Sequence, residues 1–282
     1  MRCGILLGSM LNNSETWMNL SKKNIEELEK PDKVLKDKLF GTKSSTVFYY
    51  LELGILPAKY VIMRKRLKFL KYIIDEPIET MIRKVFEEQR KETRKGDFVN
   101  LFSEDFKQLE LKTEFKDIEG FTKSAWNKKI NEITENLAFK ALVNENANKS
   151  KTKHIIYKQL EMSDYLCENK NTRVSKTIFS IRAGTLDLKQ LNPWKYNDNL
   201  CVMCNLKEES LDHFMNCNSY DRENISWEDI FQDNKEKLFE IGIEAMTRMT
   251  IRGKKKEEDG QASSLVPTAP DSLVFVCRAS EE

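Results

Sequence analysis

A short segment rich in cysteine and histidine places the strongest constraint on how this chain can fold. It reads CVMCNLKEESLDHFMNC, and its spacing is C-x2-C-x8-H-x3-C. The chain of 282 residues contains six cysteines and two histidines, and half of them fall inside this one segment. The residues concerned are Cys201, Cys204, His213 and Cys217.

This spacing is typical of a metal site. Two cysteines separated by two residues suit a tight turn in which both thiolates face one ion. Ser210 is predicted to cap a short helix, which would place His213 and Cys217 four residues apart on one helical face. Three thiolates and one imidazole make a closed tetrahedral set, which zinc favours when its role is structural. We therefore expect one structural Zn²⁺; the alternative is a pair of buried thiols beside an unrelated histidine.

The composition favours an all-α protein. Glycine (10) and proline (6) are both scarce, which disfavours turn-rich β folds. Hydrophobic residues make up 40% and charged residues 33%, as in ordinary globular domains. No stretch approaches the roughly 20 apolar residues of a membrane span, so we expect no membrane partner. Because the cysteines are clustered rather than spread as a disulfide framework, a reducing, intracellular compartment is expected, nuclear or cytoplasmic.

Helical periodicity continues along most of the chain. Ser21 is predicted to cap a helix that Pro31 breaks or kinks, and a second helix should end at Gly41. A short apolar helix should end at Gly54. Long helices are expected from Lys123 and, behind a capping box, from Ser226. The expected division is an N-terminal stump (1–20), a helical domain (21–192), a zinc-binding module (193–222), a C-terminal helix (223–252) and a disordered tail (253–282).

The most basic element follows Pro57. Apolar residues recur there at steps of three and four, which predicts an amphipathic helix. No acidic residue lies between Lys59 and Ile74. Such a face can contact phosphates without reading bases, although a solvated face is the alternative. The candidate nucleic-acid-binding residues are Lys59, Arg64, Lys65, Arg66, Lys68 and Lys71.

Three segments together resemble a known family. They are SETWMNLSKKNIEELEK (Ser14–Lys30), YLELGILPAKYVIMRKRLKFLKYII (Tyr50–Ile74) and the cysteine-rich segment, in this order. They resemble the region that follows the polymerase domain in non-LTR retrotransposon reverse transcriptases, over roughly Ser14–Tyr220. The resemblance implies contacts with template RNA and target DNA, and a zinc-binding CCHC element.

The catalytic part of that family has no counterpart here. Polymerases use paired aspartates to hold two metal ions, and this sequence contains no Asp-Asp pair. We therefore expect a truncated, non-catalytic, nucleic-acid-binding remnant with no small-molecule substrate. The alternatives are a helical protein-interaction module with a structural zinc, and a degenerate reading frame with no selected function. An active polymerase or nuclease is the remaining alternative, and it lacks the required carboxylate cluster.

Overall fold

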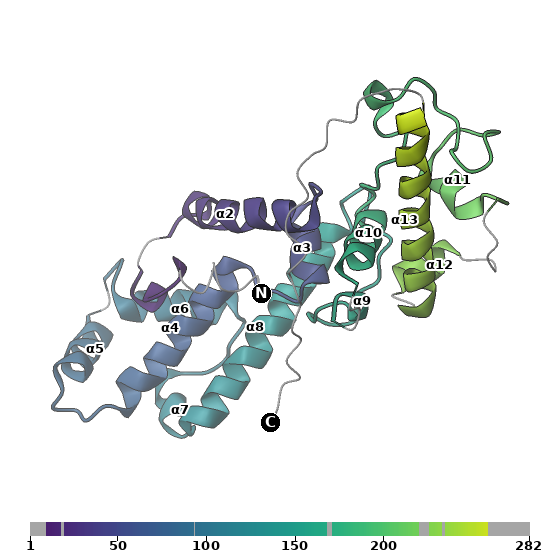
Figure 1. Cartoon of the computed structure of the whole chain (residues 1–282). Helices are drawn as coiled ribbons and strands as arrows, with labels where there is room; N and C mark the ends of the chain where they lie inside the picture. Colours follow the sequence, from purple (N-terminus) through teal and green to yellow (C-terminus); the bar gives the residue numbers. More distant parts are fainter. Residues whose placement is uncertain are drawn as a thin grey trace. The chain divides into compact units, whose positions relative to one another are not determined.

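The structure, a computed structural model, describes residues 10–17, 20–92, 94–167, 171–219, 226–232 and 235–258. Over these ranges the chain is helical, as predicted (Figure 1). The described residues form no extended strand, and their β pairing is limited to two isolated antiparallel bridges, Leu53 with Met162 and Leu200 with Glu208. The predicted all-α class is therefore confirmed.

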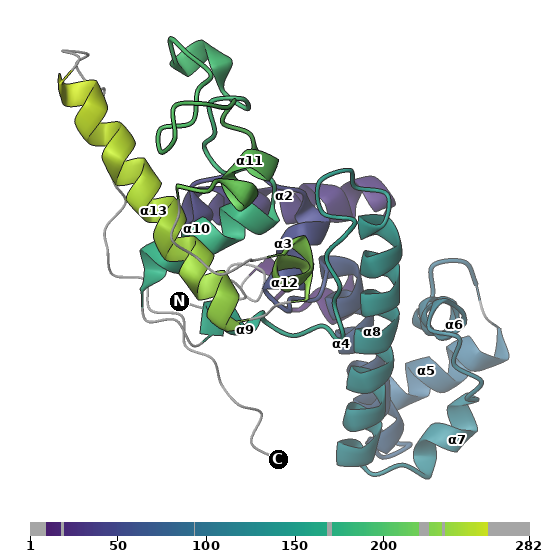
Figure 2. The ribbon, with the colours of Figure 1, turned by 90° about the vertical axis from the view of Figure 1, so that its right-hand side faces the viewer.

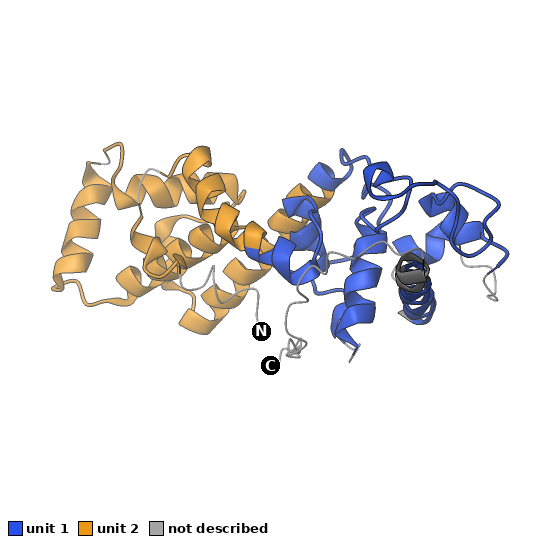
Figure 3. Cartoon of the chain, turned by 45° about the horizontal axis from the view of Figure 1, so that its top comes forward, with its two compact units in different colours: residues 1–2, 35–54, 144–282 blue, residues 3–34, 55–143 orange. Residues whose placement is uncertain are grey.

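The chain divides into two compact units (Figure 3). Unit 1 consists of Met1–Arg2, Leu35–Gly54 and Asn144–Glu282, and unit 2 consists of Cys3–Val34 and Ile55–Val143. The sequence-based division instead assigns residues 21–192 to a single helical domain. Periodicity identifies helices one at a time but does not show which of them share a core, and this explains the difference.

Unit 2 is built around α4 (Ala58–Asp75). Its neighbours are α5 (Met81–Lys91), α6 (Phe98–Gln108) and α7 (Phe115–Glu119), followed by the start of α8 (Lys123–Asn146). The predicted apolar stripe of α4 is buried, and the indole nitrogen of Trp126 donates to the carbonyl of Leu67 over 2.8 Å. The core contains Met63, Leu67, Leu70, Ile73, Ile74, Phe86, Val99, Phe102, Phe106, Leu109, Ile118, Trp126 and Ile130.

The helix boundaries correct two predictions. Helix α2 (Lys22–Phe40) continues through Pro31, so the predicted break and the separate second helix are wrong. Pro31 has no N–H to donate to the carbonyl of Glu27, so one helical hydrogen bond is missing. Both residues are exposed, so water can take the place of that hydrogen bond. Pro57, which precedes the basic helix, is the N-cap of α4. The predicted stop at Gly41 is correct, and this glycine has a φ of 68°.

Unit 1 contains α3 (Thr46–Glu52), α9 (Asp164–Cys167) and α10 (Thr172–Arg182), then α11 (Leu211–Asn216), α12 (Trp227–Phe231) and α13 (Lys235–Glu258). Helices α10 and α13 pack closely, because a Cβ atom on Gly242 would lie 2.8 Å from both Ile178 and Val174. Phe179 of α10 stacks on Phe40 at a centroid distance of 4.0 Å. These contacts form an apolar core in unit 1.

The C-terminal helix differs from its prediction. Ser226 and Asp229 do form the predicted capping box, but the helix they begin is α12, which ends at Phe231. A separate helix, α13, then runs to Glu258, beyond the predicted boundary at 253. Lysine and glutamate after Gly253 are good helix formers, so a charged composition alone did not mark the helix end. Residues 259–282 of the predicted disordered tail lie outside the described residues, as do 1–9 of the predicted stump.

A buried ion pair lies inside unit 1. The side chains of Glu52 and Arg182 are 0% and 1% exposed, and their nearest N and O atoms are 2.9 Å apart. The hydroxyls of Tyr157 and Tyr165 donate to the same carboxylate over 2.7 and 2.6 Å. Burial, and then the Glu52 charge, raise the pKa of Tyr165 well above its usual value. Both tyrosines therefore act as hydrogen-bond donors that satisfy a desolvated carboxylate.

Candidate metal centre

The first two cysteines lie on a tight turn. The backbone nitrogen of Cys201 donates to the carbonyl of Lys207, and that of Asn205 donates to the carbonyl of Cys201, each over 2.8 Å. Asn205 closes the turn with a φ of 54°, a left-handed conformation that asparagine tolerates better than most residues. This turn brings the thiols of Cys201 and Cys204 to one place, as the two-residue gap predicts.

Backbone N–H groups point at both thiols. Met203 donates to the sulfur of Cys201 and Leu206 donates to the sulfur of Cys204, each over 3.4 Å. The Leu206 N–H is the main cause that lowers the pKa of Cys204 to about 6, whereas burial raises that of Cys201 to about 11. N–H donors of this kind stabilise thiolates, the form of cysteine that binds metals.

The other two side chains come from α11 and its end. Ser210 caps this helix as predicted, and its hydroxyl oxygen accepts the N–H of His213 over 3.0 Å. Helix α11 ends at Asn216, so Cys217 is the residue after the helix rather than part of its face. The predicted helical face is therefore one residue too long, but the Cys217 thiol still reaches the cluster.

All four side chains converge. Their ligand atoms lie within 4.8 Å of one another, with Cys201 and Cys217 buried and the other two partly buried. The two sulfurs of Cys201 and Cys217 are 4.0 Å apart, and the sulfur of Cys204 is 3.2 Å from Nε2 of His213. Tetrahedral zinc with bonds of about 2.0–2.3 Å separates its ligands by about 3.5–3.8 Å.

The cluster has the donor types of a metal site, and its four ligand atoms are close enough together that they could hold one ion. None of the three cysteines forms a disulfide. In the part of the chain that the structure describes, these four residues are the one group of three or more His, Cys, Asp or Glu side chains that could hold a metal. Four strong protein ligands leave no open position in a tetrahedron, so the arrangement is suited to a structural ion.

The basic helix is arranged differently from its prediction. Arg66 is buried and forms a two-pronged contact with Asp105, at 2.7 and 2.5 Å. Burial is the main cause that raises the pKa of Asp105. The side chain of Lys71 is 3% exposed and pairs with Asp75 at 2.5 Å. Two of the six candidate nucleic-acid-binding residues are therefore buried inside unit 2.

Of the remaining four cations of α4, Arg64, Lys65 and Lys68 are only partly accessible. Arg64 donates to Thr134 over 2.9 Å, and Lys65 donates to the carbonyl of Leu11 over 2.6 Å. Burial lowers the pKa of Arg64 and of Lys68. Lys59 alone of the six is exposed. The structure does not bring the six residues together on one exposed face.

Comparisons with known proteins give no assignment. No protein-family model matches the chain, and neither the curated proteins nor the solved structures yield a match. No described helix is both long and apolar enough to cross a membrane. The resemblance to the retrotransposon family stays a prediction based on the three segments named above.

The sequence did not predict the residues that attach the four candidate metal ligands to the rest of unit 1. Glu209, which precedes the cap of α11, is buried against Arg248 and Arg252 of α13. The two arginines are four residues apart, which places them on one helical face. That spacing is the only signal in the sequence, and it does not identify the distant carboxylate.

Proposed function

We propose that Cys201, Cys204, His213 and Cys217 bind one Zn²⁺ that holds the cysteine-rich module (193–222, described here as 193–219) in its folded form. The observation that supports this most strongly is the convergence of three thiols and one imidazole within 4.8 Å. A closed set of this type favours zinc over magnesium or calcium, which prefer oxygen ligands. The ion joins the turn at Cys201–Cys204 to α11.

Metal analysis of the purified chain tests this proposal. Protein prepared without added metal should contain one zinc ion per chain, and Cys204→Ser should lose most of it because a thiolate ligand is gone. His154→Gln is the matched control, since His154 stacks on Phe231 and lies outside the cluster. A folded chain without zinc, with the same stability after chelation, would overturn the proposal.

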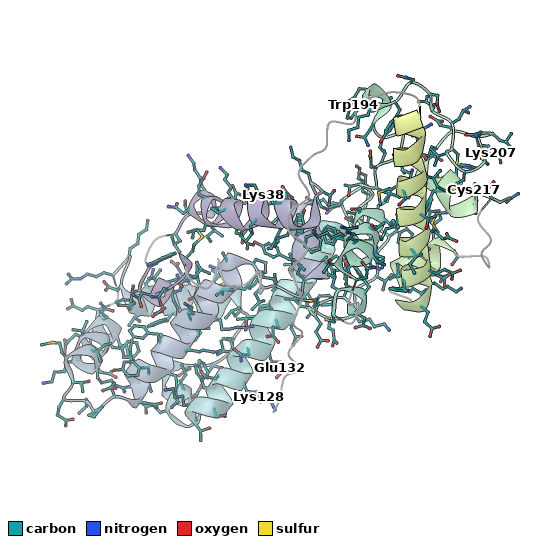
Figure 4. All side chains as sticks on the ribbon, viewed as in Figure 1. Lys38, Lys128, Glu132, Trp194, Lys207 and Cys217 are labelled. Atoms are coloured by element: carbon teal, nitrogen blue, oxygen red, sulfur yellow. The ribbon has the colours of Figure 1, made fainter. Side chains whose placement is uncertain are left out.

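We also propose that the protein is a non-catalytic nucleic-acid-binding remnant of a non-LTR retrotransposon reverse transcriptase, as the resemblance implies. The surface of the cysteine-rich module supports this proposal. Trp194 is 76% exposed and Leu206 is 82% exposed, and the neighbouring Lys207 is also exposed (Figure 4). An exposed aromatic ring and exposed cations on one module are typical of single-strand binding surfaces. A helical protein-interaction module with a structural zinc remains the rival, as does a chain with no selected function.

A salt titration separates binding to nucleic acid from the rival functions. Binding of a labelled single strand should weaken as salt rises, with a log-log slope of about −0.7 per phosphate neutralised. Lys207→Glu should reduce that slope, and Trp194→Ala should weaken binding by removing a stacking ring. Lys38→Glu is the control, because Lys38 is an exposed lysine on α2. If the chain binds neither a single strand nor a duplex at low salt, this second proposal fails and the zinc proposal is unaffected.

A further inference from the structure

The four candidate metal ligands are connected to α13 through one buried carboxylate. Glu209 lies between the turn at Cys201–Cys204 and Ser210, which caps the helix of His213, and its side chain is 2% exposed. Its Oε1 lies 2.7 Å from Nη1 of Arg248, and its Oε2 contacts Nη2 of Arg252. Oε2 also accepts the backbone N–H of Lys189 over 2.9 Å.

Both arginines are desolvated and lie against Glu209 and the carbonyl of Asp187. The side chains of Arg248 and Arg252 are 0% and 8% exposed. Each donates to the carbonyl of Asp187 over 2.8 Å, and the Arg248 guanidinium lies 5.8 Å from the ring centroid of Phe214, the neighbour of His213. In the described residues, Glu209 is the only carboxylate seen to pair with both arginines, so its loss would leave Arg248 buried without its negative partner.

The two halves of α13 are therefore held by different partners. The first half packs on α10, where Gly242 lets α13 lie close to Ile178 and Val174 of α10. The second half, which carries Arg248 and Arg252, is held by Glu209 and the segment around Asp187. In Figure 2 the last turns of α13, towards its yellow end, extend beyond α10.

We infer that metal binding controls the docking of the second half of α13, with Glu209 as the positioning residue. This inference rests on the proposed zinc site. The ion fixes both chain segments that flank Glu209, so its carboxylate stays opposite the two arginines. Without the ion, Glu209 loses its fixed position, and buried guanidinium groups without a partner are unfavourable. The second half of α13 then leaves its site, whereas the first half stays packed on α10.

Hydrogen exchange read by mass spectrometry tests this inference on the full chain. Exchange is compared between the zinc-loaded protein and the same protein after chelation, in peptides that cover 236–242 and 245–252. Chelation should accelerate exchange in 245–252 by at least about tenfold and change 236–242 much less, because local openings follow the contacts that hold each segment. The first half of the helix thus serves as an internal control.

Two neighbouring glutamates give a matched pair of variants. Glu209→Gln should keep one zinc per chain yet show fast exchange in 245–252 with zinc bound, because the amide cannot neutralise two arginines. Glu208→Gln should behave as wild type, since Glu208 is exposed. If Glu209→Gln does not fold, Arg252→Met approaches the same contact from α13 and should also retain zinc with faster exchange in 245–252.

The outcomes separate this inference from the zinc proposal. If the wild-type chain holds no metal, both are overturned. If it holds one zinc and chelation leaves 245–252 protected, or accelerates both halves of α13 equally, only the coupling through Glu209 is overturned. If folded Glu209→Gln and Arg252→Met chains keep 245–252 protected, the coupling through Glu209 is again overturned and the zinc proposal stands.

Discussion

The core around α4 and the cysteine-rich module differ in what keeps them folded. In unit 2, α4 lies against a continuous set of buried aromatic and aliphatic side chains that includes Phe86, Phe102 and Trp126. In the module, all of whose residues from 193 to 219 are described, the buried apolar side chains are Val202, Phe214 and Met215, beside the thiols of Cys201 and Cys217. Apolar burial can stabilise the first region, whereas in our proposal the second depends on a metal and on buried ion pairs.

Charged residues show the same contrast. Arg66 is neutralised by Asp105 within the apolar core of unit 2. In unit 1, Glu52 with Arg182, and Glu209 with Arg248 and Arg252, lie at points where separate segments meet. Buried pairs add little net stability but become strongly destabilising when one partner is removed. The segments of unit 1 should therefore be more sensitive to single charge changes than the surface of α4.

The largest expected effect is a charge placed in the core of unit 2. Leu67 is 0% exposed, so Leu67→Asp would bury an unpaired carboxylate beside Trp126. We expect it to destabilise unit 2 by at least about 4 kcal/mol. Urea unfolding measures this loss of free energy. It is followed by the fluorescence of Trp126 in a background whose other tryptophans are replaced by phenylalanine. A loss below about 1 kcal/mol would mean that α4 does not hold the core together.

The next effect concerns the Glu52–Arg182 pair. Arg182→Met keeps the volume but leaves Glu52 buried without its cation, and should destabilise unit 1 by about 3–5 kcal/mol. The double variant Glu52→Gln with Arg182→Met should recover part of this loss, because no unpaired charge is left. Chemical unfolding of the three chains measures it. Equal stability of the single and double variants would contradict the role given to this pair.

A smaller effect is expected from the cap of α11. Ser210→Ala removes the acceptor of the His213 N–H, which should cost about 1 kcal/mol and weaken zinc binding about fivefold. Competition with a zinc chelator measures the affinity. Ser226→Ala is the control, since Ser226 caps α12 outside the cluster. Unchanged affinity in Ser210→Ala would mean that α11 does not need its cap to present His213.

The smallest effect on stability is expected on the surface of α4. Replacing Lys65 and Lys68 with glutamate removes one bond to the carbonyl of Leu11 and two partly buried charges. The free energy of unfolding should fall by less than about 1 kcal/mol. If α4 contacts phosphates, the same variant binds all nucleic acids more weakly and with a smaller salt slope. An unchanged slope would assign any binding to the cysteine-rich module instead.

The sequence predicts what depends on nearby residues. The spacing of the four ligands, the cap at Ser210 and the buried stripe of α4 follow from local geometry and periodicity. Whether a charged side chain is exposed or buried in an ion pair does not follow from them, because its partner can be distant in the sequence. Asp105 lies 39 residues from Arg66, and Glu209 lies 43 residues from Arg252. An apolar residue type does not by itself mean burial either, since Met81 in α5 is 77% exposed.

The most direct test of the central claim is the coordination of the bound metal. X-ray absorption at the zinc edge, on protein purified without added metal, reports the number and type of ligand atoms. The proposed site predicts three sulfur atoms at about 2.3 Å and one nitrogen atom at about 2.0–2.1 Å. Cys204→Ser should lower the sulfur count or abolish binding. A spectrum dominated by oxygen ligands, or protein that is fully folded without zinc, would contradict the account.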